Sequence, residues 1–189
     1  VQKDPSLIAL LPGSRKQEIE KMLPIFSLLS KEMPEFKFEV SVMPQYSLEY
    51  YQSYSTDRGE NLLFSERPTY EMLNEARAAI VASGTATLET ALLNTPQVVA
   101  YKTSGLSYQV GKRVIKTKYI SLVNLILDKP AVTELIQQQL SINNLKQELQ
   151  DLINDPSELL RDYQELNVLL GSPGASSRAA KYILEDLES

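Results

Sequence analysis

Short apolar runs alternate with helix-length segments along the first hundred residues, and this alternation limits the folds open to the chain. The runs lie at residues 7–11, 37–42, 62–64, 79–82 and 98–101. After the first run, Ile19, Met22 and Phe26 recur at helical spacing. Strands that alternate with helices predict a parallel sheet with helices on both faces. The expected fold class is therefore α/β, with a Rossmann-like sheet.

The chain changes character beyond residue 120. Residues 119–125 predict a last strand and loop, whereas Ser141 and Asp155 are each predicted to cap a new helix. The glycines of "GSPG" at 171–174 end the second of these, and a last helix follows. We therefore expect a Rossmann-like domain over residues 1–140 and a helical tail over 141–189.

Composition excludes several kinds of chemistry. The 189 residues contain no cysteine and no histidine, so disulfides, imidazole bases and the usual zinc ligands are absent. We expect no metal and no cofactor, although composition alone leaves a carboxylate site for magnesium open. The net charge of −5 argues against broad nucleic-acid binding. No run of about 18 apolar residues is present to cross a bilayer.

The chain also starts without Met, just ahead of a strand, and we expect it to be part of a longer protein.

Two loops rich in small residues are the candidate sites, "PGSRKQEIE" at 12–20 and "ASGTATLE" at 82–89. Both follow predicted parallel strands, and ligands of α/β sheets bind outside the carboxyl ends of the strands. The loops are therefore expected to lie at one edge of the sheet.

The second loop, Ser83-Gly84-Thr85, has two interpretations. It can cradle a phosphate, because glycine allows close approach and the first helical amides are unpaired. No acid stands in residues 85–88 to neutralise that helix end, and Thr85 and Thr87 add hydroxyl donors. Alternatively, Ser83 is only a helix cap and Gly84 a turn residue. Glu89 is either an acceptor for a ribose diol or a solvated carboxylate.

The first loop is open to the same question. Ser14 and Gln17 form a capping box that would start the helix unaided. The box leaves Arg15 unexplained, because a cation at a helix N-terminus opposes the helix dipole and is better used to pair with an external anion. Further along, Asn124 either reads a nucleobase edge or forms a turn with its own backbone.

Five segments taken together, in their order and spacing, resemble lipid-A-disaccharide synthase. They are "LLPGSRKQEIEKMLP", "ASGTATLETALLNTPQVVAYK", "KTKYISLVNLI", "TELIQ" and "GSPGASSRAAKYIL". The resemblance implies the C-terminal, sugar-nucleotide-binding half of a two-domain GT-B glycosyltransferase. It also implies transfer of 2,3-diacylglucosamine from UDP to 2,3-diacylglucosamine 1-phosphate, with inversion and a β-1,6 linkage.

The resemblance also implies site residues and partners. Its UDP-binding positions are Gly13, Ser14, Arg15, Ser83, Gly84, Thr85, Thr87, Glu89 and Asn124. It implies a general base outside this chain, so that the chain alone is expected to be inactive. It further implies a helical tail that packs on a missing N-terminal domain or on a second protomer, as in a homodimer.

Lipid substrates imply peripheral attachment to the inner face of the cytoplasmic membrane. Five basic residues and no acid lie within residues 102–118, and this stretch is either a contact for anionic lipid or a solvated face. The alternatives to the transferase are another UDP-sugar enzyme of GT-B-like fold, such as a 2-epimerase, and a non-catalytic UDP-sugar-binding module.

Overall fold

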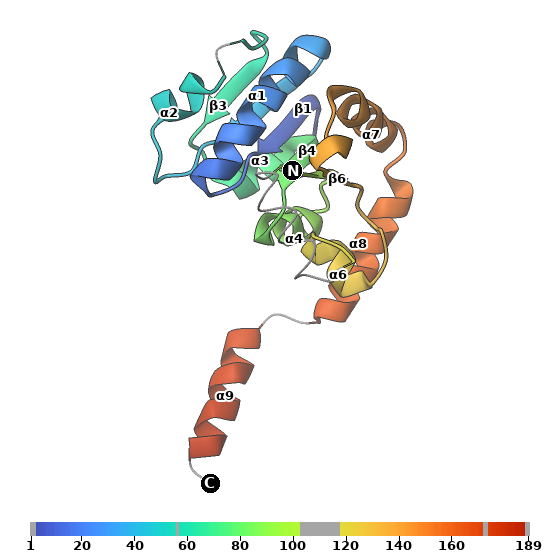
Figure 1. The fold of residues 1–189 in the computed structure, drawn as a ribbon. Helices are drawn as coiled ribbons and strands as arrows, with labels where there is room; N and C mark the ends of the chain where they lie inside the picture. Colours follow the sequence, from blue (N-terminus) through green and yellow to red (C-terminus); the bar gives the residue numbers. More distant parts are fainter. Residues whose placement is uncertain (1–2, 56, 103–117, 172–173, 188–189) are drawn as a thin grey trace.

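The computed structural model describes residues 3–55, 57–102, 118–171 and 174–187. Six strands form one sheet: β1 (Asp4–Leu11), β2 (Lys37–Ser41), β3 (Leu62–Ser65), β4 (Ala76–Ala82), β5 (Gln97–Tyr101) and β6 (Glu134–Ile136). Every neighbouring pair is parallel, in the order β3-β2-β1-β4-β5-β6 (Figure 1). The predicted α/β fold with a parallel Rossmann-like sheet is confirmed.

The helices of the described ranges fill the connections and the C-terminal part. They are α1 (Lys16–Glu32), α2 (Leu48–Ser53), α3 (Thr69–Glu75), α4 (Thr85–Leu92), α6 (Leu122–Leu127), η1 (Gln137–Gln139), α7 (Ile142–Asn154), α8 (Ser157–Leu170) and α9 (Ala175–Leu187).

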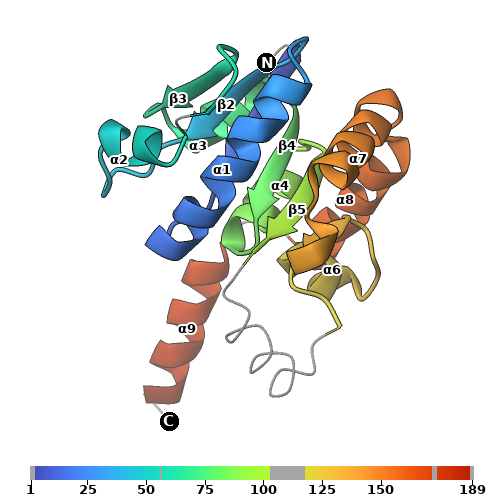
Figure 2. The same cartoon turned by 45° about the horizontal axis from the view of Figure 1, so that its top comes forward.

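The sheet carries a hydrophobic layer on each face, because its strands are buried on both sides and alternate residues face opposite ways. Ile8, Leu10 and Ile80 pack with α1, α2 and α7 on one face. Their neighbours Ala9 and Val81 pack with α3 on the other face, where α4, α6 and α8 complete a second cluster. Figure 2 shows helices on both sides of the strands.

The prediction of a last strand within residues 119–125 was wrong. Residues 119–125 do not form a strand: α6 begins at Leu122, because the Ser121 hydroxyl caps the helix by accepting from the Asn124 N–H at 3.2 Å. The last strand is instead β6, a three-residue strand that pairs with β5.

The predicted caps of the next two helices had different outcomes. The Ser141 hydroxyl accepts from the Asn144 N–H, so this cap is confirmed. Asp155 is one residue too early, since Pro156 is the N-cap of α8. The Asp155 carboxylate accepts from the Ser157 N–H at 3.0 Å, however, and so satisfies a free amide at the helix start.

The helical tail divides into two parts. Leu145 and Leu149 of α7 and Tyr163 of α8 are fully buried against the Rossmann-like sheet and its helices. Helix α9 extends away from the rest of the fold (Figures 1 and 2), and its Ile183 and Leu184 are exposed. The boundary predicted at residue 140 stays a prediction.

Candidate functional site

A cavity of about 430 Å³ lies at the carboxyl ends of β1 and β4. These two strands are neighbours: β2 and β3 extend the sheet on the side of β1, and β5 and β6 extend it on the side of β4. The place where the strand order reverses is the switch point, and ligands of doubly wound sheets bind there. The cavity is lined by Leu11, Pro12, Gly13, Ser14, Arg15, Glu18, Ser41, Met43, Thr69, Ala82, Ser83, Gly84, Thr85, Ala86 and Glu89. Seven of the nine predicted UDP-binding residues are in this set; Thr87 and Asn124 are not.

The loop after β1 is held by a carboxylate. Glu18 Oε2 accepts from the backbone N–H groups of Ser14 and Arg15 at 3.1 and 3.2 Å. Glu18 Oε1 accepts from the Arg15 guanidinium at 3.1 Å. The predicted Ser14–Gln17 capping box is wrong by one residue: Arg15 is the N-cap and Glu18 stands at the N3 position. A carboxylate at N3 is favoured because it interacts with both the amides and the helix dipole.

The Arg15 guanidinium remains accessible despite this pairing. Its side chain is 82% exposed, against 13% for Glu18. An exposed ion pair of this kind contributes little and is easily exchanged for another anion. Arg15 therefore lies at the cavity as a cation that an incoming phosphate can recruit.

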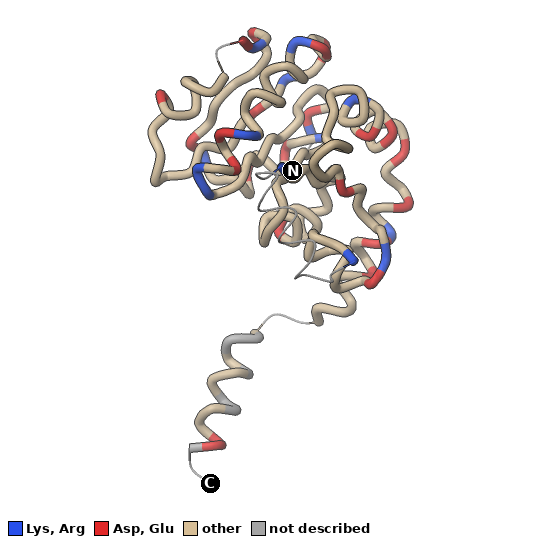
Figure 3. Tube along the Cα trace, viewed as in Figure 1, with Lys and Arg blue, Asp and Glu red and all other residues tan. Residues whose placement is uncertain are grey.

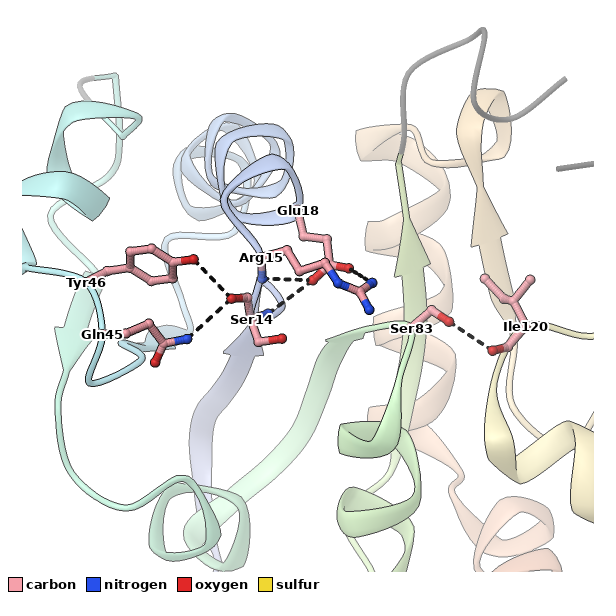
Figure 4. Close-up of polar contacts among 7 residues, drawn as sticks. All are labelled: Ser14, Arg15, Glu18, Gln45, Tyr46, Ser83 and Ile120. Atoms are coloured by element: carbon pink, nitrogen blue, oxygen red, sulfur yellow. Dashed lines mark hydrogen bonds and ion pairs between the residues drawn. The ribbon is translucent and has the colours of Figure 1, made fainter. Parts of the chain in front are cut away.

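Two polar side chains that follow β2 support the same loop. Gln45 Nε2 and the Tyr46 hydroxyl both donate to the Ser14 carbonyl, at 3.4 and 3.3 Å. In Figure 4 these two side chains approach Ser14 from the side opposite Ser83.

The Tyr50 hydroxyl donates to Glu20 at 2.9 Å. Burial, aided by this carboxylate, raises the pKa of Tyr50, so the phenol stays a proton donor.

The loop after β4 is differently arranged. Gly84 is the N-cap of α4, with φ +151° and ψ −163°, a conformation that favours glycine. Ser83 is not the cap; its hydroxyl donates to the Ile120 carbonyl at 2.9 Å (Figure 4). The first turn of α4 contains no acidic residue. The first amides of this helix therefore lie at the cavity edge, and no carboxylate in the same turn accepts hydrogen bonds from them.

The other predicted residues of this helix lie on different sides of it. Thr85 and Glu89 are exposed and line the cavity. Thr87 is fully buried, and its hydroxyl donates to the Gly84 carbonyl at 2.8 Å. Thr87 thus helps to hold the glycine turn rather than presenting a free donor.

Asn124 lies outside the cavity, in a closed network of hydrogen bonds. It is 1% exposed. Its amide donates to the Val132 carbonyl and to Glu134, and its oxygen accepts from the Val132 N–H. Glu134 also accepts from the N–H groups of Ile120 and Ser121. The side chain of Asn124 is therefore occupied by its own chain, and its role in binding UDP stays a prediction.

Sequence reasoning missed three residues that line the β2 side of the cavity. Ser41 ends β2 and Thr69 begins α3, and their hydroxyl oxygens lie 2.7 Å apart. Met43 is the third. The signal for Ser41 was present, because β2 was predicted as a strand and its carboxyl end falls beside that of β1.

Charge and composition of the described ranges limit what the site can hold. Among these residues no group of three or more carboxylates could hold a metal ion, and no helix is both long and apolar enough to span a bilayer. Basic and acidic residues are interspersed along the described trace (Figure 3). Of the basic stretch at 102–118, only Lys102 and Lys118 are described; the remainder lies outside the described residues.

The fold is the parallel Rossmann-like sheet that is also found in GT-B glycosyltransferases. Solved structures with this fold include a UDP-GlcNAc 2-epimerase from Neisseria meningitidis bound to UDP-GlcNAc, with a TM-score of 0.62 and 15% identity over 97% of this chain and 46% of that one. The glycotransferase of kitacinnamycin matches at 0.60 and 15% identity, over 96% of this chain and 43% of that one. At such identities the likeness concerns the fold alone.

The sequence comparisons are more specific. The family model described as lipid-A-disaccharide synthetase matches residues 1–184. The lipid-A-disaccharide synthase of Psychromonas ingrahamii is 36% identical, over 100% of this chain and 51% of its own length. That of Syntrophus aciditrophicus is 35% identical, over 95% and 49%. The chain belongs to the lipid-A-disaccharide synthase family, and it spans about half the length of these curated relatives.

Proposed function

We propose that this chain is the sugar-nucleotide-binding half of a lipid-A-disaccharide synthase. The full enzyme transfers 2,3-diacylglucosamine from UDP to 2,3-diacylglucosamine 1-phosphate, with inversion and formation of a β-1,6 linkage. One observation carries the proposal: in a chain of this family, the loops after β1 and β4 meet around one cavity at the switch point of the sheet.

The residues of the cavity suit the departure of UDP. As the sugar leaves, negative charge builds on the β-phosphate and must be stabilised by fixed donors. The first amides of α4 supply such donors, and the helix dipole favours an anion at that end. Arg15 adds a cation and Thr85 a hydroxyl, while Glu89 accepts from the ribose diol. The general base belongs to a part of the enzyme outside these residues.

Calorimetry on the 189-residue chain tests the donor site. We expect UDP to bind, and Arg15→Ala to weaken binding by about 1–3 kcal/mol through loss of a charge-assisted contact. Arg161→Ala is the matched control, since Arg161 is exposed on α8 and does not line the cavity. Unchanged UDP affinity in Arg15→Ala would remove Arg15 from the phosphate site.

Reconstitution tests the reaction itself. The chain is joined to the missing half, taken from its own upstream sequence or from the Psychromonas relative, and supplied with both lipid substrates. A disaccharide product supports the transferase, and its absence favours a non-catalytic UDP-sugar-binding module. The same protein distinguishes the remaining alternative, because a 2-epimerase would turn over plain UDP-N-acetylglucosamine whereas the proposed enzyme requires the diacylated donor.

The remaining partners belong to the same proposal. Val168, Leu169 and Leu170 at the end of α8 are exposed, as are Ile183 and Leu184 of α9. Exposed apolar side chains at this density favour a protein surface that another domain or protomer covers. Lipid substrates favour a peripheral position on the inner face of the cytoplasmic membrane.

A further inference from the structure

A second cavity of about 370 Å³ adjoins the first. It is lined by Arg15, Lys16, Gln17, Glu18, Tyr101 and Lys102. Arg15 and Glu18 line both cavities, so the two spaces share a wall. The second cavity lies between the start of α1 and the end of β5, which places it on the α1 side of the predicted UDP site.

Positive charge is in excess in this second cavity. Its one carboxylate, Glu18, is engaged by Arg15 and by the loop amides. No ion pair joins Lys16 or Lys102 to a carboxylate within the described ranges. Lys129, by contrast, is paired with Asp162 at 2.8 Å and with Glu165 at 2.6 Å. Arg15, Lys16 and Lys102 thus line one hollow against a single carboxylate, in a protein whose net charge is −5. The Lys16 ammonium lies 6.0 Å from the centre of the Tyr50 ring.

The chemistry of the lining fits a phosphate monoester attached to a sugar. Lysine is a compact point charge that binds a phosphate without the planar geometry that arginine imposes. The Gln17 amide and the Tyr101 hydroxyl can hydrogen-bond to sugar hydroxyls, and the half-buried Tyr101 ring offers a flat apolar surface. Lys16 begins α1 and Lys102 follows β5, far away in sequence, so the fold itself brings these two residues to one cavity.

We propose that this second cavity binds the phosphate of the acceptor sugar, with Lys16 and Lys102 as its cationic ligands. This inference rests on the proposed function, in which a sugar 1-phosphate must lie beside the UDP-sugar while the glycosidic bond forms. The arrangement then assigns the two phosphorylated substrates to opposite sides of Arg15 and Glu18, and Lys16 and Lys102 become determinants of specificity for a phosphorylated acceptor.

The test is a nuclear magnetic resonance titration of the 189-residue chain with glucosamine 1-phosphate, both free and saturated with UDP. We expect the amide signals of Lys16, Gln17 and Lys102 to shift in both states, and glucosamine without phosphate to shift them far less. Lys16→Gln/Lys102→Gln should weaken this binding at least tenfold. Lys21→Gln/Lys37→Gln, which removes the same charge outside both cavities, should leave it unchanged.

Three results would overturn the proposal. The first is an absence of shifts at these residues, the second is equal binding by the double variant, and the third is equal binding of glucosamine. A membrane role is distinguished by vesicles containing phosphatidylglycerol: vesicle binding that the double variant abolishes, with no response to glucosamine 1-phosphate, assigns the lysines to lipid instead.

Failure of this subsite is separable from failure of the proposed function. UDP binding, measured by calorimetry on the same samples, reports on the first cavity alone. A chain that binds UDP but not glucosamine 1-phosphate keeps its donor site and loses the second subsite. A chain that binds glucosamine 1-phosphate through the two lysines but does not bind UDP keeps the subsite and contradicts the assigned donor.

Discussion

The loop after β1 and the loop after β4 both lead from a buried parallel strand into a helix. They differ in what accepts hydrogen bonds from the backbone amides at the start of that helix. In the first, Glu18 accepts from the amides of Ser14 and Arg15 and from the Arg15 guanidinium. In the second, α4 begins at a glycine cap with no acid in its first turn. One loop thus carries its own anion, and the other leaves an anion position open.

This difference indicates that the two loops have different roles in binding a phosphate. A loop whose amides are satisfied internally is stable without ligand and offers a shaped wall and a cation. A loop with unsatisfied helical amides gains most from a bound phosphate. We therefore expect the α4 loop to supply most of the diphosphate contacts and the α1 loop to supply charge and position.

The largest expected effect comes from crowding the closed loop. In Gly13→Ala the new Cβ would overlap the Glu18 carboxylate, and the backbone φ of +101° strains any side chain. Strain and the displaced acceptor should lower the free energy of unfolding in urea by about 2–4 kcal/mol. Gly84→Ala is the matched control, since a Cβ there meets no atom within 4 Å; it should lose only the strain energy, about 1–2 kcal/mol. Equal losses would contradict the difference between the loops.

Filling the open anion position should have the next largest effect. Thr85→Asp places a carboxylate in the first turn of α4 and should stabilise the free chain by about 0.3–1 kcal/mol through the helix dipole. The same charge should weaken UDP binding by at least tenfold in calorimetry. Thr85→Asn has a similar shape without the charge, and should lose much less affinity. Were both variants to bind UDP like the parent chain, phosphate would not lie at this helix end.

Removing the internal anion should give the smallest effect, with opposite signs for stability and binding. Glu18→Gln weakens the contacts to Ser14 and Arg15 and should cost about 0.5–1.5 kcal/mol of stability. It also releases Arg15 and removes a negative charge from the cavity, so UDP should bind a few-fold more tightly. Glu35→Gln removes an exposed charge that does not line the cavity and serves as control. Weaker UDP binding in Glu18→Gln would mean that Glu18 itself contacts the ligand.

The sequence predicted the sheet well because buried parallel strands are short apolar runs, and five of them were long enough to recognise. Strand β6 has three residues and carries Glu134 at its start, so no periodicity marks it. The α6 helix was mistaken for a strand because its residues are nearly all apolar, and such a short run does not distinguish the two.

The site was predictable in outline and not in its hydrogen bonds. Ligands of α/β sheets bind outside the carboxyl ends of the strands, and this rule located both loops because it depends only on strand direction. The helix start was misplaced by one residue because Ser14–Gln17 and Arg15–Glu18 overlap as capping patterns, and only the structure shows that the carboxylate is used. Likewise no local pattern reveals that Asn124 is bound to Val132 and Glu134, since those contacts depend on how two segments fold together.

The pairing of β1 with β4 also has a consequence for folding kinetics. Leu10 lies opposite Ile80, with the whole β2–β3 half of the sheet between them in sequence. Closing so long a loop costs chain entropy before the contacts between β1 and β4 can offset it. We therefore expect the pairing of these two strands to be a late and slow step in folding. A ligand that bridges the two loops can bind only after that event. Its binding energy then adds to the stability of the central strand pair, so ligand protection against unfolding should report when the two halves of the sheet have joined.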